Sequence, residues 1–496
     1  MPWLTKSRFL SGLQCHKRLW FEIHQPLEEE TPPNLQMLQG RQFDEIVQSL
    51  QPGRVISRDR GMPAAISETN TIMARGALAP ATLYQPAFRA GDLAVIVDIL
   101  RREGDAFTLT EVKASTQVKV IHIPDVSFQA LVVRRAGIPV TTVRLGHVNK
   151  QFVLRRQGDY DGLMIEEDIT AAVEDYLPRA SAASEQLLDI TRQPAAPVLD
   201  TGAHCDDPYP CPFFQRCSAN QTPRPTYPVN VLPKGGKIID GLLADGFRDL
   251  CVVPADRLTS PTHLRVHAAT VSGIPHFDVS PTRALRLLPR PHTYLDFETI
   301  NSAIPEIIGT RPYEQMPFQW SVHAEDAAGR FSHFEYLAIE SFGDFAALAH
   351  ALVQATPTEG PVFAYNAAFE NNVLLQLADL VPAHAVALRQ IAGRLFDLLP
   401  VTRQAWYHRD MLGSWSIKKV IPTIAPSLGY GELDHVQDGG GAQEAFTQLR
   451  AGGLDQERDQ ELRKALLKYC RLDTWAMVIL RRFLCEEAID VEDCAT

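Results

Sequence analysis

Hydrophobic and polar positions in the first 150 residues predict helices followed by a small β-rich unit. Apolar residues recur at helical spacing over much of residues 1–50. The apolar run 92–99 and the run 107–113, separated by a Glu-Gly-Asp turn, predict a strand–turn–strand unit. A helix over 124–136 and a strand over 140–148 are expected to follow.

The remaining pattern divides the chain into three regions. A Pro-rich stretch over 218–234 predicts the end of a first domain, residues 1–223. Residues 224–290 are expected to form a mostly helical connector. Strands and helices alternate through 291–496, which predicts a second domain and an α/β fold class for the chain. The Gly439–Gly441 run lacks a following Lys-Ser/Thr, so it is interpreted as a surface loop.

Composition narrows the class of protein. The 496 residues are 45% hydrophobic, which excludes a mostly disordered or fibrous chain. No apolar run approaches the ~18 residues that cross a bilayer, and Met1–Gln14 lacks the apolar stretch of a signal peptide. A cytoplasmic protein without a membrane partner is therefore expected. The net charge of −11 argues against a nucleic-acid coat protein, but residues 101–150 hold eight basic and four acidic residues.

Asp98, Glu111 and Lys113 form the first candidate site. Asp98 ends one predicted strand, and Glu111 and Lys113 share a face near the end of its predicted hairpin partner. Two converging carboxylates can hold a divalent cation, and a lysine beside them can orient or deprotonate a water. The alternative is a solvated strand face. The apolar run before Asp98 favours the functional interpretation, because an unpaired carboxylate there is costly.

These residues, with Gln129 on the next helix, resemble the motifs of RecB-like PD-(D/E)XK nucleases. The resemblance implies a restriction-endonuclease-like mixed-sheet domain using Mg²⁺ or Mn²⁺. It implies metal binding at Asp98, Glu111 and Val112, a catalytic Lys113, and a Gln129 that helps place the lysine and the substrate. Many members carry an early helical histidine as a further ligand; Asp44 stands there in this chain.

Four of the eight cysteines form a second candidate centre. Cys205, Cys211 and Cys217 are spaced by six residues, and Cys15 is the candidate fourth ligand. Four thiolates suit zinc or an iron–sulfur cluster. The pattern resembles iron–sulfur RecB-like nucleases of the CRISPR-adaptation and AddB type, which implies a structural [4Fe-4S] cluster. The other cysteines, Cys251, Cys470, Cys485 and Cys494, are interpreted as small apolar fillers.

A third constellation of four acids and a tyrosine lies in the C-terminal region. Asp296 and Glu298 share one face of an apolar strand, and Glu370 follows another strand. Tyr469 and Asp473 lie one helical turn apart. Together these acids can hold two divalent cations, Mg²⁺ or Mn²⁺, and aim a water at a phosphodiester.

This order resembles the DnaQ-like DEDD exonucleases whose last motif is Tyr-x-x-x-Asp. The resemblance implies an RNase H-like α/β domain with 3′-to-5′ exonuclease activity, metal binding by Asp296, Glu298, Glu370 and Asp473, and water positioning by Tyr469. The family has Asp where this chain has Glu370, and Asp397 is a candidate substitute. Lys418 and Lys419 are interpreted either as phosphate contacts or as a solvated helix end.

The sequence therefore predicts a metal-dependent nuclease with two active sites and nucleic acid, DNA before RNA, as its partner. Protein partners are not predicted. A nucleic-acid-binding scaffold with one or both sites inactive is the alternative, favoured by Glu370 and Asp44. An iron–sulfur redox protein explains the cysteines but leaves the acids unexplained.

Overall fold

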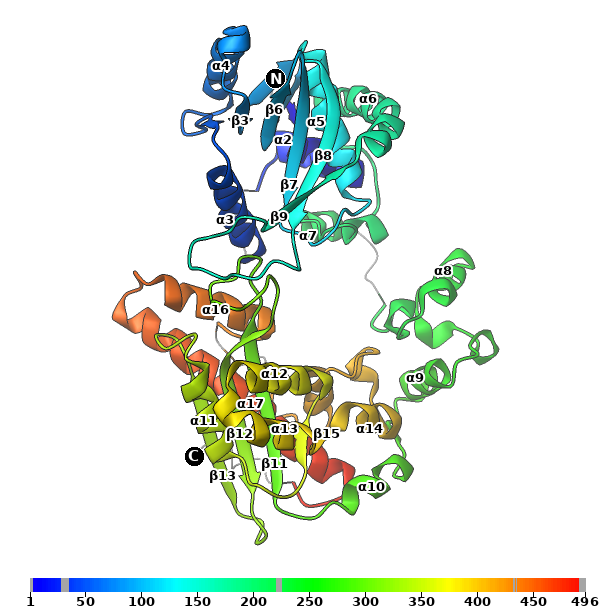
Figure 1. Cartoon of the computed structure of the whole chain (residues 1–496). Helices are drawn as coiled ribbons and strands as arrows, with labels where there is room; N and C mark the ends of the chain where they lie inside the picture. Colours follow the sequence, from blue (N-terminus) through cyan, green and yellow to red (C-terminus); the bar gives the residue numbers. More distant parts are fainter. Residues whose placement is uncertain (1–2, 28–34, 220–224, 431–432, 434, 490–496) are drawn as a thin grey trace. The chain divides into compact units, whose positions relative to one another are not determined.

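Figure 1 shows the computed structural model of the chain, which describes residues 3–27, 35–219, 225–430, 433 and 435–489. The fold is mixed α/β, which confirms the expected fold class. The chain divides into two compact units, unit 1 (1–222 and 301–314) and unit 2 (223–300 and 315–496). The predicted domain end at residue 223 lies outside the described residues.

Unit 1 contains two β-sheets. The larger is mixed, with strand order β2-β3-β6-β7-β8-β9, and the smaller has the order β1-β5-β4. The central β7 pairs antiparallel with β6 and parallel with β8. The strands are β1 (Leu4–Thr5), β2 (Arg54–Val55), β3 (Thr82–Tyr84), β4 (Ala87–Ala90), β5 (Leu93–Ile96), β6 (Ile99–Glu103), β7 (Ala106–Lys113), β8 (Val140–Val148) and β9 (Met164–Asp168).

The apolar run 92–99 is divided between the two sheets, so its prediction as one strand is wrong. β5 pairs with β1 and β4, whereas β6 begins only at Ile99 and pairs with β3 and β7. Asp98 lies where the chain crosses between the sheets. There its main-chain carbonyl accepts a hydrogen bond from the Gln85 N–H, and its side chain turns toward β7.

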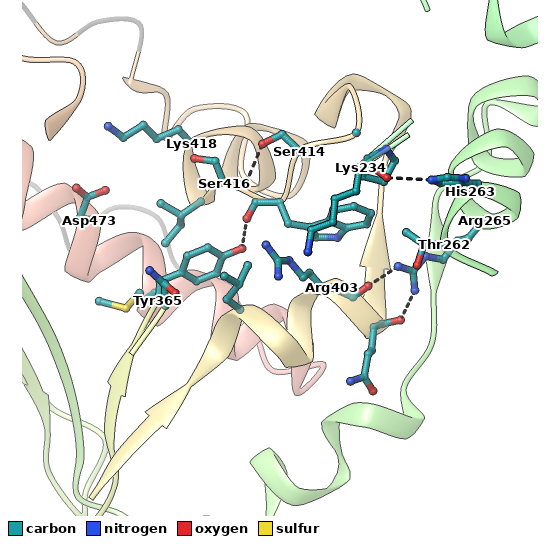
Figure 2. A pocket seen from close by; sticks show the side chains of 18 of the residues that line it. Lys234, Thr262, His263, Arg265, Tyr365, Arg403, Ser414, Ser416, Lys418 and Asp473 are labelled. Carbon is teal, nitrogen blue, oxygen red and sulfur yellow. Dashed lines mark hydrogen bonds between the residues drawn. The ribbon is translucent and has the colours of Figure 1, made fainter. Parts of the chain in front are cut away.

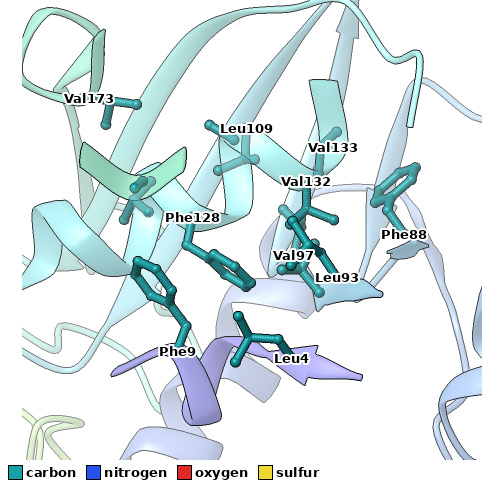
Figure 3. Packing of buried hydrophobic residues seen from close by; sticks show 14 of the residues in the cluster. Leu4, Phe9, Phe88, Leu93, Val97, Leu109, Phe128, Val132, Val133 and Val173 are labelled. Carbon is teal, nitrogen blue, oxygen red and sulfur yellow. The ribbon is translucent and has the colours of Figure 1, made fainter. Parts of the chain in front are cut away.

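Helices pack around the sheets of unit 1 through buried apolar clusters. Phe9 of α1 stacks on Phe128 of α5 with ring centroids 4.3 Å apart, and Leu109 of β7 is buried in the same cluster (Figure 3). This packing brings the N-terminal helix onto the helix that follows β7. The helices are α1 (Lys6–Gln14), α2 (His16–His24), α3 (Leu35–Leu50), α4 (Met62–Met73), α5 (His122–Arg135), α6 (Thr170–Arg192) and α7 (Phe214–Ser218).

Unit 2 is built on a five-stranded mixed sheet with strand order β13-β12-β11-β14-β15. The central β11 pairs antiparallel with β12 and parallel with β14. Stacking of Phe318 on Phe446 packs α16 on β12, and α17 is held there by a hydrogen bond from Gln319 Nε2 to the Leu466 carbonyl. The strands are β11 (His292–Ile300), β12 (Met316–Glu325), β13 (Phe331–Leu337), β14 (Val362–Ala364) and β15 (Leu395–Asp397). The helices are α11 (Phe345–Ala355), α12 (Ala368–Leu380), α13 (Ala385–Ala392), α14 (Leu398–Ala405), α15 (Ile417–Val420), α16 (Gly439–Ala451) and α17 (Gln456–Leu484).

The connector is part of unit 2. It contains α8 (Gly236–Ala244), α9 (Pro261–Ser272) and α10 (Arg283–Arg286). The short strand β10 (His276–Phe277) pairs with β16 (Trp406–Tyr407), which anchors the connector to the C-terminal region.

Two local predictions are wrong. The Gly439–Gly441 run opens α16 instead of forming a loop, because the Asp438 carboxylate caps that helix by accepting from the Gly441 N–H at 2.8 Å. Cys251 is exposed, whereas Cys470 and Cys485 are buried as expected and Cys494 lies outside the described residues. Among the helices of the described residues, none is both long enough and apolar enough to span a lipid bilayer.

Candidate metal-dependent active sites

In unit 1 the predicted residues converge at the end of β7. The Val112 N–H donates to Asp98 Oδ2 at 2.8 Å, which fixes that carboxylate beside β7. Lys113 Nζ donates to Glu111 Oε1 at 2.6 Å, so these side chains share a face as the strand period predicts. Gln129 Nε2 donates to Glu111 Oε2 at 2.7 Å from α5.

Two further residues that the sequence analysis missed complete this cluster. Asp125 accepts from Lys113 Nζ at 2.7 Å and from Gln129 Nε2 at 2.9 Å. Its spacing of four residues from Gln129 was a usable signal, since i and i+4 side chains meet on a helix. Lys6 Nζ donates to Glu111 Oε1 at 2.7 Å, across 105 residues of sequence, and no local pattern indicates that contact.

Burial and charge set the protonation of this cluster. Burial raises the pKa of Glu111, but Lys113 and Lys6 outweigh it and hold that pKa well below its usual range. Burial and the neighbouring Glu111 carboxylate hold the pKa of Asp98 well above its usual range. Burial, with Glu111 next in effect, raises the pKa of Asp44 to about 6, so this residue of α3 is electrostatically part of the site. A divalent cation bound at this position would relieve the repulsion among Asp98, Glu111 and Asp44.

In unit 2 three predicted carboxylates meet closely. Ligand oxygens of Asp296 and Glu298 on β11 and of Asp473 on α17 all lie within 4.8 Å of one another. Among the described residues this is the one group of three or more Asp, Glu, His or Cys side chains with that spacing. Oxygen ligands at such distances suit a hard divalent cation.

Glu370 lies in the first turn of α12, outside this close group. It is 3% exposed, and its Oε2 has no hydrogen-bond partner among the described residues. Burial, with Asp397 and Asp473 nearby, raises the pKa of Glu370 to about 8. Asp397, the candidate substitute, caps α14 by accepting from the Leu399 N–H at 3.0 Å and also accepts from the Asn366 N–H.

Lys418 and Cys470 also reach this centre. Lys418 Nζ donates to the Tyr469 hydroxyl at 2.7 Å and to the Gln437 carbonyl at 2.8 Å, so it is not a solvated helix end. The Cys470 sulfur lies 3.5 Å from Asp296 Oδ2, so this cysteine contacts a candidate metal ligand in addition to filling apolar space. Burial, with Asp473 and Glu298 next in effect, raises the pKa of Tyr469, which keeps its hydroxyl protonated as a donor.

The unit 2 carboxylates predict a metal response that depends on pH. Burial is the main cause that raises the pKa of Glu298 and that of Glu370 to about 8 in the folded chain, from an ordinary value of 4.5. The folded metal-free protein therefore binds more protons than the unfolded chain between pH 4.5 and 8. Its free energy of unfolding from these groups is highest below pH 4.5 and falls as the pH rises through 8. Because a cation binds the ionised carboxylates, its affinity rises over the same interval.

We expect Mn²⁺ to raise the melting temperature by a few degrees more at pH 8 than at pH 6, measured by differential scanning fluorimetry against EDTA. Glu298→Gln should weaken this pH dependence without removing it, because Glu370 also ionises near pH 8. Glu457→Gln, which removes an exposed charge from the same unit on α17, should keep it. Equal Mn²⁺ shifts at both pH values in the unsubstituted chain would contradict the assignment.

The four predicted cysteine ligands line one small cavity in unit 1, together with Lys17, Arg18 and neighbouring residues. Cys15 lies at the start of α2, and the Cys211 N–H donates to the Cys205 carbonyl at 2.7 Å. Within the described chain no three of these sulfurs lie within 4.8 Å of one another.

Comparisons with known proteins give similarity without an activity. Residues 293–416 match a family model described as "Domain of unknown function (DUF2779)". The chain is 28% identical over 211 residues to the "Uncharacterized protein MG366 homolog" of Mycoplasma pneumoniae, covering 38% of this chain and 32% of that protein. It is 28% identical over 216 residues to the "Uncharacterized protein MG366" of Mycoplasma genitalium, covering 40% and 32%. The chain thus spans about a third of the length of these relatives.

Proposed function

We propose that this protein is a metal-dependent nuclease with one active site in each unit and a structural [4Fe-4S] cluster in unit 1. The observation that carries the proposal is the close approach of Asp296, Glu298 and Asp473 in unit 2. A cluster of buried carboxylates is costly unless protons or cations neutralise it. A divalent cation held by these carboxylates would supply Lewis acidity and a bound water for phosphodiester hydrolysis.

The unit 2 arrangement supports a DnaQ-like, RNase H-like 3′-to-5′ exonuclease. The acids come from the central strand and the last helix, with Glu370 on the helix that follows β14. The protonated hydroxyl of Tyr469 is held by Lys418 beside the carboxylates. From there it positions a water by hydrogen bonding without itself becoming a ligand.

The unit 1 arrangement supports a RecB-like PD-(D/E)XK, restriction-endonuclease-like nuclease. Asp98, Glu111 and the Val112 main-chain carbonyl would hold Mg²⁺ or Mn²⁺. Glu111 and Asp125 hold the Lys113 ammonium between them and raise its pKa despite burial, so this lysine acts as a charged donor. Gln129 bridges the same two acids and fixes their orientation. A positive donor there stabilises charge on a phosphate oxygen.

The shared cavity of Cys15, Cys205, Cys211 and Cys217 supports the cluster proposal. The cluster would be structural, because its ligands join the start of unit 1 to its end. Nucleic acid, DNA before RNA, is the proposed partner.

A nucleic-acid-binding scaffold is the second candidate function. Two observations favour it: Glu370 lies outside the close carboxylate group, and Lys6 and Lys113 both occupy Glu111 Oε1. A scaffold binds DNA with either metal and leaves it intact.

Degradation of end-labelled single- and double-stranded DNA with Mg²⁺ or Mn²⁺ separates the two functions. Four forms of the chain are compared: the unsubstituted chain, Lys113→Met, Asp473→Asn and the double variant. We expect each single variant to lose one product pattern and the double variant to lose both. DNA left intact by the unsubstituted chain with both metals, or cut equally by the double variant, would refute the nuclease proposal.

Lys113→Met, made in the Asp473→Asn background, should reduce unit 1 cleavage by at least ~100-fold, as loss of one transition-state donor does. DNA affinity should change little, because one charge among several is lost. Lys150→Met, which removes an exposed lysine of unit 1, is the matched control and should cut normally. Cleavage that survives Lys113→Met at full rate would place the catalytic centre elsewhere.

A further inference from the structure

A groove in unit 2 extends from the carboxylates to the connector. Its volume is about 1190 Å³, which exceeds the ~300–1,000 Å³ typical of a small-molecule pocket. Figure 2 shows Asp473 and Lys418 at one end, Thr262 and His263 of the connector at the other, and Tyr365 and Arg403 between them. The groove is therefore long and suits an extended ligand.

The charges that line this groove are segregated. Its acidic lining residues are Asp296 and Asp473, both at the proposed metal site. The other charged lining residues are basic: Lys234, Arg265, Arg403 and Lys418. Hydroxyl groups of Ser260, Thr262 and Ser416 lie among them. Cations and hydroxyls spaced along a groove are the side chains that contact nucleic-acid phosphates.

The connector wall is held firmly against the rest of unit 2. Arg265 of α9 donates to the main-chain carbonyls of Gln404, at 2.9 Å, and Arg403. His263 bonds the Pro233 carbonyl at 2.9 Å through Nε2, which fixes the turn that carries Lys234. Arg265 and His263 are thus occupied in building the wall, whereas Lys234 and Arg403 present their charges to the groove.

The connector also differs from the whole chain in charge. Residues 225–290 contain eight Lys or Arg and five Asp residues, in a chain of net charge −11. Of these basic residues, Lys234 and Arg265 line the groove, and basic side chains there attract a polyanion.

We propose that the connector and α14 form a clamp for the backbone of one DNA strand, with Lys234 and Arg403 contacting phosphates upstream of a 3′ end at the unit 2 carboxylates. This inference rests on the proposed function of unit 2 and adds a substrate requirement to it. A single strand long enough to reach from the carboxylates to α9 gains these contacts, and a mononucleotide ester does not. Lys234 and the wall residues of α9 lie outside the matched domain, residues 293–416, whereas Arg403 lies inside it.

Binding tests the clamp without relying on activity. Anisotropy of a labelled 12-residue oligothymidine is measured with the full chain carrying Lys113→Met and Asp473→Asn, so that no strand is cut. Adding Lys234→Gln or Arg403→Gln should weaken binding about tenfold, as loss of one charged hydrogen bond does. Each should lower the slope of log affinity against log salt by about 0.7, the value for one phosphate on a single strand. Lys237→Gln removes an exposed connector charge that does not line the groove and should change neither quantity.

Kinetics then separates the clamp from the chemistry. In the Lys113→Met background, Lys234→Gln and Arg403→Gln should lower kcat/KM on the oligonucleotide by the same factor as binding. Hydrolysis of the 4-nitrophenyl ester of thymidine 5′-monophosphate should be unchanged, because this substrate has no upstream strand. If the groove variants lose binding while protein that retains Asp473 hydrolyses neither substrate, that result would support the clamp and refute the nuclease. The clamp would be refuted if Lys234→Gln and Arg403→Gln bound the oligonucleotide as tightly as Lys237→Gln does. It would also be refuted if blunt duplex DNA gave the same salt slope as the single strand.

Discussion

Asp473→Asn should abolish trimming of labelled DNA ends, with a loss of at least about a thousandfold. The substitution removes one of three carboxylates whose oxygens lie within 4.8 Å. A cation at such a site contributes several kcal/mol to the transition state, and each 1.36 kcal/mol is a factor of ten in rate. The asparagine is isosteric, but its neutral amide is a weaker ligand for Mg²⁺ or Mn²⁺.

The fold of this variant should survive. Burial raises the pKa of Asp473, and the residue accepts a hydrogen bond from the Tyr430 hydroxyl that an amide oxygen can also accept. The melting temperature in EDTA should therefore be equal to or above that of the unsubstituted chain, because a buried acid has been replaced by a neutral group. Glu457→Gln, on the same helix, is the matched control and should trim normally. End trimming by Asp473→Asn at the original rate would make unit 2 a binding platform.

Cys211→Ser should bleach anaerobically purified protein and destabilise unit 1. The proposed cluster joins Cys15 to three cysteines nearly 200 residues later, which removes freedom from the unfolded chain. A single cross-link closing a loop of about 100 residues contributes up to ~4.7 kcal/mol in the chain-entropy model, and the gain grows slowly with length. We therefore expect a loss of a few kcal/mol, measured by denaturant unfolding of unit 1.

Unit 1 should remain partly folded without the cluster, because other contacts join its ends. Gln14 Nε2 donates to the carbonyls of His204 and Tyr209 at 2.8 and 2.7 Å. Phe21 of α2 stacks on Phe213 with centroids 5.3 Å apart. Cys251→Ser, at an exposed cysteine of unit 2, is the control and should keep both colour and stability. Stoichiometric zinc without iron in the purified protein would refute the iron–sulfur assignment.

Local periodicity determined which candidate residues share a face. Glu111 and Lys113 are two residues apart on β7, and their side chains meet at 2.6 Å. Asp296 and Glu298 obey the same rule on β11. A strand or helix imposes its period on neighbouring side chains whatever the rest of the fold does. The sequence alone therefore predicted the central residues of both candidate sites and the α/β class.

Tertiary packing decided which distant side chains join those sites. Lys6 reaches Glu111 because the stacking of Phe9 on Phe128 places α1 against α5. Lys418 reaches Tyr469 across 51 residues. Such contacts depend on how whole helices and strands pack, and the spacing of residues along the chain does not indicate that packing.

The connector and the crossing at Asp98 show the same limit. Residues 93–97 are uniformly apolar, so their pattern does not reveal that the chain leaves one sheet for another before Ile99. The connector's sequence predicted helices but not the groove they line with α14 and α15. Sequence determines the direction of a side chain from its own element, because that direction follows from backbone geometry over a few residues. The partners that side chain meets are decided by burial of apolar surface across the fold, which only the assembled structure specifies.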